Sequence, residues 1–259
     1  MRLAAILVLV FFFVLSVTAQ VGPQMESAIL GRLANLEKWS NYGEESDYEK
    51  LEKENASLRA DILRLGRAPA TIEYLFPKLK GKMYVVTSKD GRLRIYSWDR
   101  ETGGTMHDFD SVYQYRGDSG KVYTWADTRE EDSGGVFYHE IFQVDTRSKP
   151  IYLTISTFIG STSFAGQNVD AVRILGERLD TKAKVFRTAK GTTHTIGFPF
   201  DFFSVVDRPE RPVMLFKYDA IKRQLSFPVV IEDDATPQGR VTEKMITYRF
   251  KGYAFVKVS

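Results

Sequence analysis

The most regular feature of this chain is an alternation of apolar and polar positions that starts near Lys82 and continues to the C-terminus. It is clearest in three runs, at residues 151–155, 225–231 and 246–250, where a core-type apolar residue recurs at every second position. Because successive side chains of a strand point to opposite faces, this alternation predicts β-strands with one face in a core. Turn signals with glycine separate the runs, at residues 90–91, 102–104, 117–120, 133–135 and 251–252. We therefore predict a mainly β domain, built as an antiparallel meander, a propeller-like fold or a sandwich.

A weak internal repeat bears on the choice among these folds. Four predicted strands end in an aspartate, namely Asp99, Asp145, Asp180 and Asp219, which are 46, 35 and 39 residues apart. A propeller blade takes about 40–45 residues. Aspartate is also ordinary turn chemistry, since its carboxylate accepts backbone N–H bonds across a turn. The repeat therefore favours a propeller-like or meandering sheet only slightly, and a sandwich stays an alternative.

Residues 24–67 have helical periodicity instead. A first apolar stripe consists of Met25, Ile29, Leu33 and Leu36. The helical pattern is then interrupted at residues 40–43. A second stripe has heptad spacing with Asn55 as a polar member, and its apolar positions are Tyr48, Leu51, Leu58, Ile62 and Leu65. This seam is shorter than the roughly three to four heptads typical of a coiled coil. We favour a helical hairpin or helices packed on the β domain, and a homodimer through residues 46–66 is the alternative.

The first nineteen residues have the pattern of a signal peptide. Arg2 precedes an apolar run at residues 4–17, and Val17-Thr18-Ala19 provides the small residues that a signal peptidase needs before Gln20. The apolar run is shorter than the ~20 residues that span a bilayer, so we expect cleavage, with an uncleaved anchor as the alternative. The predicted location is secreted or periplasmic. The predicted organisation is a signal peptide at 1–19, a helical segment at 20–67, a linker at 68–81 and an all-β domain at 82–259.

Composition narrows the function classes. The chain has no cysteine, which excludes disulfides, thiol catalysis, cysteine-ligated zinc and iron–sulfur clusters. The formal charge is +3, or +2 once Arg2 is removed, and basic and acidic residues are interleaved. A nucleic-acid binder would concentrate its basic residues on one face, so we expect no nucleic-acid partner. No second apolar run approaches membrane-spanning length, so we also expect no membrane span after cleavage of the signal peptide.

The richest cluster of chemistry surrounds the Gly103-Gly104 turn. Tyr96 and Trp98 share a strand face with Arg92 and Arg94, which suits contact with a partner or a saccharide. A histidine beside carboxylates follows the turn and could form an acid–base pair. The candidate binding residues are Arg94, Trp98, His107, Asp108 and Asp110. We assign no catalytic residue, no metal and no cofactor.

Other motifs have simpler explanations. Ser119 and Ser133 lie in Asp-Ser-Gly sequences like those around a protease nucleophile, but both segments read as hairpin turns. The acidic residues 127–132 do not match the ligand order of a helix-flanked calcium loop. His139 reads as a histidine at the edge of the core. Asp201, between aromatic residues, could serve a hydrolase as a general acid.

The segments DGRLRIYSWDRETGGTMH and FFSVVDRPERP resemble a signature of uncharacterised exported bacterial proteins, and this resemblance implies no activity, cofactor or substrate. The leading hypothesis is an exported, non-enzymatic β domain that binds a protein or a cell-envelope glycan. One alternative is a hydrolase of envelope polymer that uses Asp108, Asp110 or Asp201 with His107. Another is a structural component that dimerises through residues 46–66.

Overall fold

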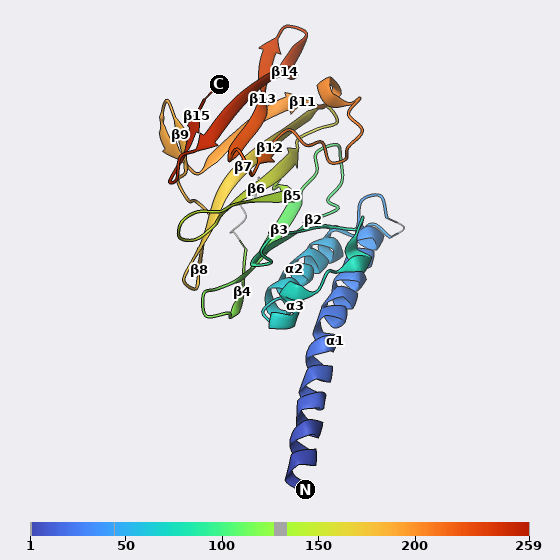
Figure 1. Cartoon of the computed structure of the whole chain (residues 1–259). Coiled ribbons are helices and arrows are strands. Elements are labelled where there is room, and N and C mark those ends of the chain that lie inside the picture. Colours follow the sequence, from blue (N-terminus) through green and yellow to red (C-terminus); the bar gives the residue numbers. More distant parts are fainter. Residues whose placement is uncertain (1, 44, 127–133, 259) are drawn as a thin grey trace.

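The computed structural model describes residues 2–43, 45–126 and 134–258, with side chains from residue 20 onward. The predicted fold class is confirmed, since the chain is mainly β with antiparallel sheets after an N-terminal helical segment. The elements form a stack of four layers, in which two helices cover the first of three sheets (Figure 1). Within the part of the chain whose side chains are described, no helix is long and apolar enough to span a bilayer.

The helical layer is a hairpin of α1 (Arg2–Trp39) and α2 (Tyr48–Leu65). The chain reverses at the predicted break, and Asp47 caps α2 by accepting a hydrogen bond from the backbone N–H of Lys50. Arg32 of α1 joins the two helices through ion pairs with Glu54 and Asp61. The apolar stripe of α2 is buried within the chain at Leu51, Asn55, Leu58 and Ile62. A dimer through residues 46–66 stays a prediction, and it would have to use the outer side of α2.

The predicted linker at 68–81 holds two short helices, α3 (Pro69–Glu73) and the 3₁₀ helix η1 (Pro77–Leu79). Tyr74 donates a hydrogen bond to Glu26 of α1, and Phe76 packs against Tyr96 with ring centroids 5.5 Å apart. Leu75, which lies between these two residues, is 84% exposed. Tyr74 and Phe76, on either side of it, make the contacts of this segment with α1 and with the aromatic ring of Tyr96.

The first sheet is a meander in chain order, β1-β2-β3-β4. Its strands are β1 (Tyr84–Thr87), β2 (Leu93–Asp99), β3 (Phe109–Arg116) and β4 (Val122–Trp125). One face of β2 packs under the helices through Tyr96 and Trp98, and the other packs on the second sheet through Leu93 and Ile95. Both faces of β2 are therefore buried.

The second sheet has the order β11-β7-β6-β5, with β8 attached to β7. Its strands are β5 (Phe137–Val144), β6 (Ile151–Ile159), β7 (Phe164–Leu175), β8 (Arg178–Asp180) and β11 (Thr195–Asp201). The predicted alternation at 151–155 is present, but the strand is buried on both faces. Leu153 contributes to the core shared with the third sheet, whereas Tyr152 contributes to the core shared with the first.

The third sheet has the order β10-β9-β15-β14-β13-β12. Its strands are β9 (Phe186–Thr188), β10 (Gly191–Thr193), β12 (Lys217–Asp219), β13 (Gln224–Asp233), β14 (Thr236–Phe250) and β15 (Phe255–Lys257). The pair β15–β9 is parallel, an exception to the antiparallel pattern. The alternation predicted through residue 231 ends early, because a register shift between Pro228 and Val230 turns Ile231 outward to 39% exposure.

The repeated aspartates mark strand ends, as expected. Asp99, Asp180 and Asp219 end β2, β8 and β12, and Asp145 directly follows β5. These strands belong to three sheets of different size that are stacked in layers. The stacking is closer to the sandwich alternative than to blades arranged around an axis.

Candidate functional site

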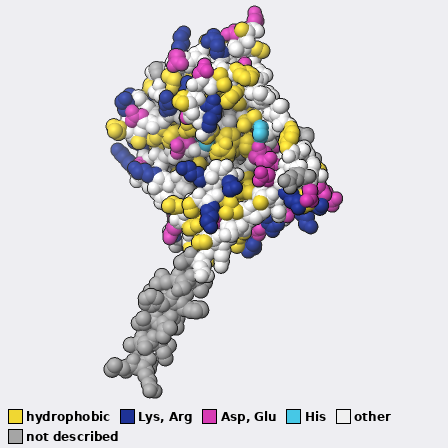
Figure 2. All heavy atoms as spheres, turned by 90° about the vertical axis from the view of Figure 1, so that its right-hand side faces the viewer, with side chains coloured by type: hydrophobic (Ala, Val, Ile, Leu, Met, Phe, Trp, Pro, Cys, Tyr) yellow, Lys and Arg dark blue, Asp and Glu magenta, His cyan; other side chains and the backbone are white. Residues whose placement is uncertain are grey.

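A cavity of about 910 Å³ lies where the first two sheets meet. In the first sheet the start of β1 and the start of β3 both pair with the end of β2, so these three strand ends lie side by side at the cavity. In the second sheet the start of β5 pairs with the end of β6, and the start of β7 pairs with the end of β11. Figure 2 shows the face of the molecule that carries η2 (Phe202–Val205) and the loop after it. Hydrophobic side chains gather in the middle of this face, and charged side chains surround them.

Aromatic rings form one wall of the cavity. Tyr84 stacks on Phe137 with centroids 4.2 Å apart, and Phe137 contacts Phe109 at 4.8 Å. Phe200 and Phe202 line the wall on the side of β11 and η2. The sequence places these rings at the ends of strands, where the layers diverge and a side chain can border a cavity as well as a core.

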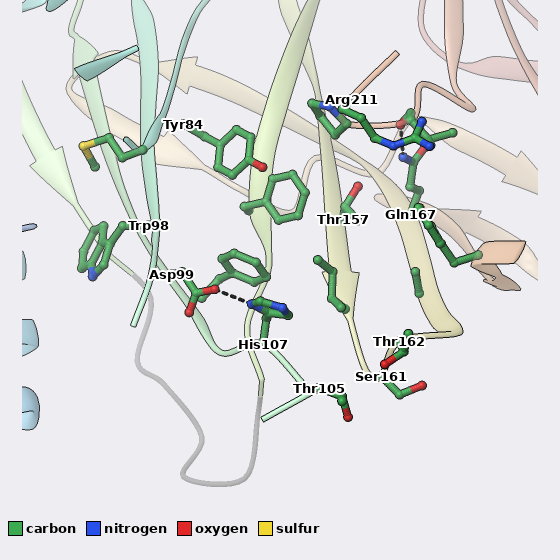
Figure 3. A pocket seen from close by; sticks show the side chains of 18 of the residues that line it. Tyr84, Trp98, Asp99, Thr105, His107, Thr157, Ser161, Thr162, Gln167 and Arg211 are labelled. Atoms are coloured by element: carbon green, nitrogen blue, oxygen red, sulfur yellow. Dashed lines mark hydrogen bonds and ion pairs between the residues drawn. The ribbon is translucent and has the colours of Figure 1, made fainter. Parts of the chain in front are cut away.

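A paired carboxylate and imidazole lie at one end of this wall (Figure 3). Asp99 Oδ2 is 2.5 Å from Nδ1 of His107, while Asp99 Oδ1 accepts the backbone N–H of Glu101 at 2.9 Å. The His107 ring stacks on Phe109, and its backbone N–H donates to the carbonyl of Ile159. With Nδ1 donating to the carboxylate, the neutral imidazole would have an acceptor nitrogen at Nε2.

The charge of Asp99 affects its neighbours. Burial raises the pKa of Tyr84, and the negative charge of Asp99 raises it further. The pKa of the Glu101 carboxyl is also raised, first by burial and then by Asp99. Burial is the larger cause of both shifts, and the charge of Asp99 is the second.

The opposite side of the cavity is held by Gln167 and Arg211 (Figure 3). Gln167, which is buried, donates to the carbonyl of Val213 at 2.5 Å and accepts the backbone N–H of Leu215 at 3.1 Å. The guanidinium of Arg211 donates to the carbonyls of Arg208, Glu210 and Val206. These two side chains therefore fix the loop that forms this wall.

Two of the predicted binding residues lie under the helices. Arg94 is 3% exposed, and it donates to the carbonyl of Thr71 at 2.7 Å and to the hydroxyl of Thr87 at 2.8 Å. Trp98 is also buried and donates from Nε1 to Asn55, although one edge of it borders the cavity. The strand face that we expected to meet a partner is instead covered by α1 and α2.

The predicted carboxylates are dispersed. Asp108 pairs with Arg100 at 2.5 Å, and Asp110 pairs with Arg59 of α2 at 2.5 Å. Asp201 caps η2 by accepting the backbone N–H of Phe203. Of the five predicted binding residues, Trp98 and His107 line the cavity. The partner of His107 is Asp99, one of the four aspartates of the weak repeat at strand ends.

The pairing of Asp99 with His107 had a signal in the sequence. In the β2–β3 hairpin Asp99 pairs with Phe109, so a residue just before Phe109 returns beside Asp99 after the Gly-Gly turn. Recognising Asp99 and His107 as partners requires the register of the β2–β3 hairpin. The sequence alone did not fix that register.

The other motifs of the sequence have structural roles where they fall within the described residues. Ser119 bonds to the carboxylate of Glu177, as expected of a turn residue. Ser133 and the acidic residues 127–132 lie outside the described residues. His139 contacts Thr157, and burial lowers its pKa to about 4. No cluster of three or more metal-type side chains occurs in the described part of the chain.

A scan against protein-family models finds no match for this sequence, and a search of the curated proteins finds none either.

Proposed function

We propose that this protein is an exported binding protein whose cavity takes a segment of a cell-envelope glycan. The observation that carries the proposal is the cavity itself, which combines aromatic rings with hydroxyl, amide, imidazole and carboxylate groups. Ligand sites are concave, about 300–1,000 Å³ in volume, and mostly apolar with a few convergent polar groups. The cavity at the ends of β1, β3 and β5 has these properties.

A glycan suits this lining better than a folded protein does. Rings such as Tyr84 and Phe137 can pack against the apolar face of a sugar ring. Thr105, Ser161 and Thr162 offer hydroxyl groups for the sugar hydroxyls. A stable protein partner would need about 800 Å² of surface on each side, which a cavity of this kind does not offer by itself.

Export and the helical layer complete the proposal. The apolar run behind Arg2 and the small residues before Gln20 support secretion or transfer to the periplasm. The hairpin of α1 and α2 packs against the first sheet and so helps to keep rigid the strand ends that line the cavity. The resemblance to exported bacterial proteins is compatible with this location but adds no ligand.

The proposal is tested by calorimetric titration of the protein with a panel of neutral and amino-sugar tetrasaccharides. Thr162→Trp places a large side chain at the exposed rim of the cavity, and Thr192→Trp is the matched control on β10. We expect at least one tetrasaccharide to bind, with affinity lowered at least ~10-fold by Thr162→Trp and unchanged by Thr192→Trp. Absence of binding by the whole panel, or equal binding by both variants, would refute the proposal.

One observation favours hydrolysis as a second candidate function. An imidazole oriented by a carboxylate, as His107 is by Asp99, is an arrangement that can activate water as a general base. Incubation of the protein with the same tetrasaccharides distinguishes the two functions. New reducing ends that are absent with His107→Ala would indicate hydrolysis, whereas unchanged sugars after binding would indicate a binding protein.

A further inference from the structure

We propose that the ligand of the cavity carries an ammonium group, which is received by the carboxylate of Asp99 beside the aromatic wall. This inference rests on the proposed function and adds the chemical class of the ligand. Three features support it: the placement of Asp99, the absence of an ion pair between Asp99 and any lysine or arginine of the described residues, and the rings next to it.

The placement of Asp99 leaves its carboxylate able to accept further hydrogen bonds. Each of its oxygens has one hydrogen-bond partner, His107 for Oδ2 and the backbone of Glu101 for Oδ1. A carboxylate offers about four acceptor positions, so each oxygen can accept a second donor. Because Asp99 lines the cavity, that donor can be a group of the ligand (Figure 3).

Two carboxylates on the same hairpin form ion pairs with arginine, whereas the ionisable partner of Asp99 within the described residues is a histidine. Arg100 pairs with Asp108, and Arg59 pairs with Asp110. Among the described residues, no lysine or arginine forms an ion pair with Asp99, whose partner is the imidazole of His107. Burial raises the pKa values of Tyr84 and Glu101, and the negative charge of Asp99 raises both further.

The aromatic wall adds a second source of attraction for a cation. Phe109 and Phe137 form a continuous series of rings from His107 to Tyr84. Ring faces attract cations within about 6 Å, and rings combined with a carboxylate are a common way of recognising ammonium groups. On the opposite wall Arg211 is committed to backbone carbonyls. Lys82 also lines the cavity, but within the described residues it forms no ion pair with Asp99, so the carboxylate can still receive a cationic group of the ligand.

The test compares two probes that differ mainly in charge, a tetramer of glucosamine and a tetramer of N-acetylglucosamine, by calorimetric titration of the full chain at low salt. We expect the amine to bind at least ~10-fold more tightly, as a charge-assisted hydrogen bond would give. General attraction cannot produce this preference, because the protein has a formal charge of +3.

Two variants assign the preference to a residue. Asp99→Asn keeps the size of the side chain and removes its charge, and Asp219→Asn is a control at a partly exposed carboxylate outside the cavity. We expect Asp99→Asn to abolish the preference for the amine over the acetylated tetramer. Asp219→Asn should retain the preference.

The outcomes separate this inference from the proposed function. Equal affinities of the wild-type protein for the two tetramers would overturn the inference and leave glycan binding intact, and this comparison needs no variant. A preference that survives in a folded Asp99→Asn protein would also overturn it. Absence of binding by every tetrasaccharide would instead overturn the proposed function.

Discussion

Replacing Asn55 by leucine tests whether the polar position of α2 belongs to the packing within one chain. Asn55 is 2% exposed, donates to the carbonyl of Arg100 at 2.9 Å and accepts from Nε1 of Trp98 at 3.1 Å. Leucine has a similar size and leaves the buried indole N–H and the part-buried carbonyl without this hydrogen bond. Each such group costs about 1–3 kcal/mol. The apolar side chain and its better helix propensity return about 1 kcal/mol.

We therefore expect Asn55→Leu to lower the free energy of unfolding by about 1–5 kcal/mol. Urea denaturation of wild-type and variant protein measures this difference, with Lys53→Leu as a control at an exposed position of the same helix. The coiled-coil alternative predicts the opposite sign, because leucine in place of a polar seam residue stabilises a coiled coil. A variant as stable as the wild type, or one whose stability increases with protein concentration, would refute the packing argument.

Three further predictions concern buried polar side chains. Arg94→Ala leaves the carbonyl of Thr71 without its charged donor and should cost about 2–4 kcal/mol of stability, measured by urea denaturation. The folded-state pKa of His139 is lowered from 6.5 to about 4. The unfolded chain thus binds more protons between these values, so stability should fall as the pH drops from 6.5 to 4, and His139→Gln should flatten that dependence. Gln167→Ala frees the segment around Val213, and we expect weaker tetrasaccharide binding together with a lower melting temperature.

The fold class could be predicted because it depends on local patterns. The alternation from residue 82 onward and the break at residues 40–43 each identify their elements without long-range information. Which strands would be covered on both faces could not be predicted, since the polar residues of β2 and β6 resemble those of a solvated face. Arg94 and Thr154 are buried because other layers satisfy or enclose them.

The candidate site was predicted in part. His107 was singled out, but Arg94 and Trp98 were placed on an exposed face because the sequence does not show that the helices return over β2. Asp99 was treated as a turn residue, which is the commoner role of an aspartate after a strand. The cavity itself is formed by residues from strands far apart in the chain, such as Tyr84, Phe137 and Phe200, so no local motif reveals it.

The double burial of β2 and β6 has a consequence for the timescale of motion around the cavity. Amide hydrogens of strands enclosed on both faces exchange with solvent only when the whole domain opens, so these two strands should be the slowest-exchanging part of the molecule. Edge strands such as β8 and β10 should exchange much sooner. Since Asp99 and Thr157 lie toward the ends of the two slow strands, a ligand would meet groups already held in place and would lose little entropy in ordering them.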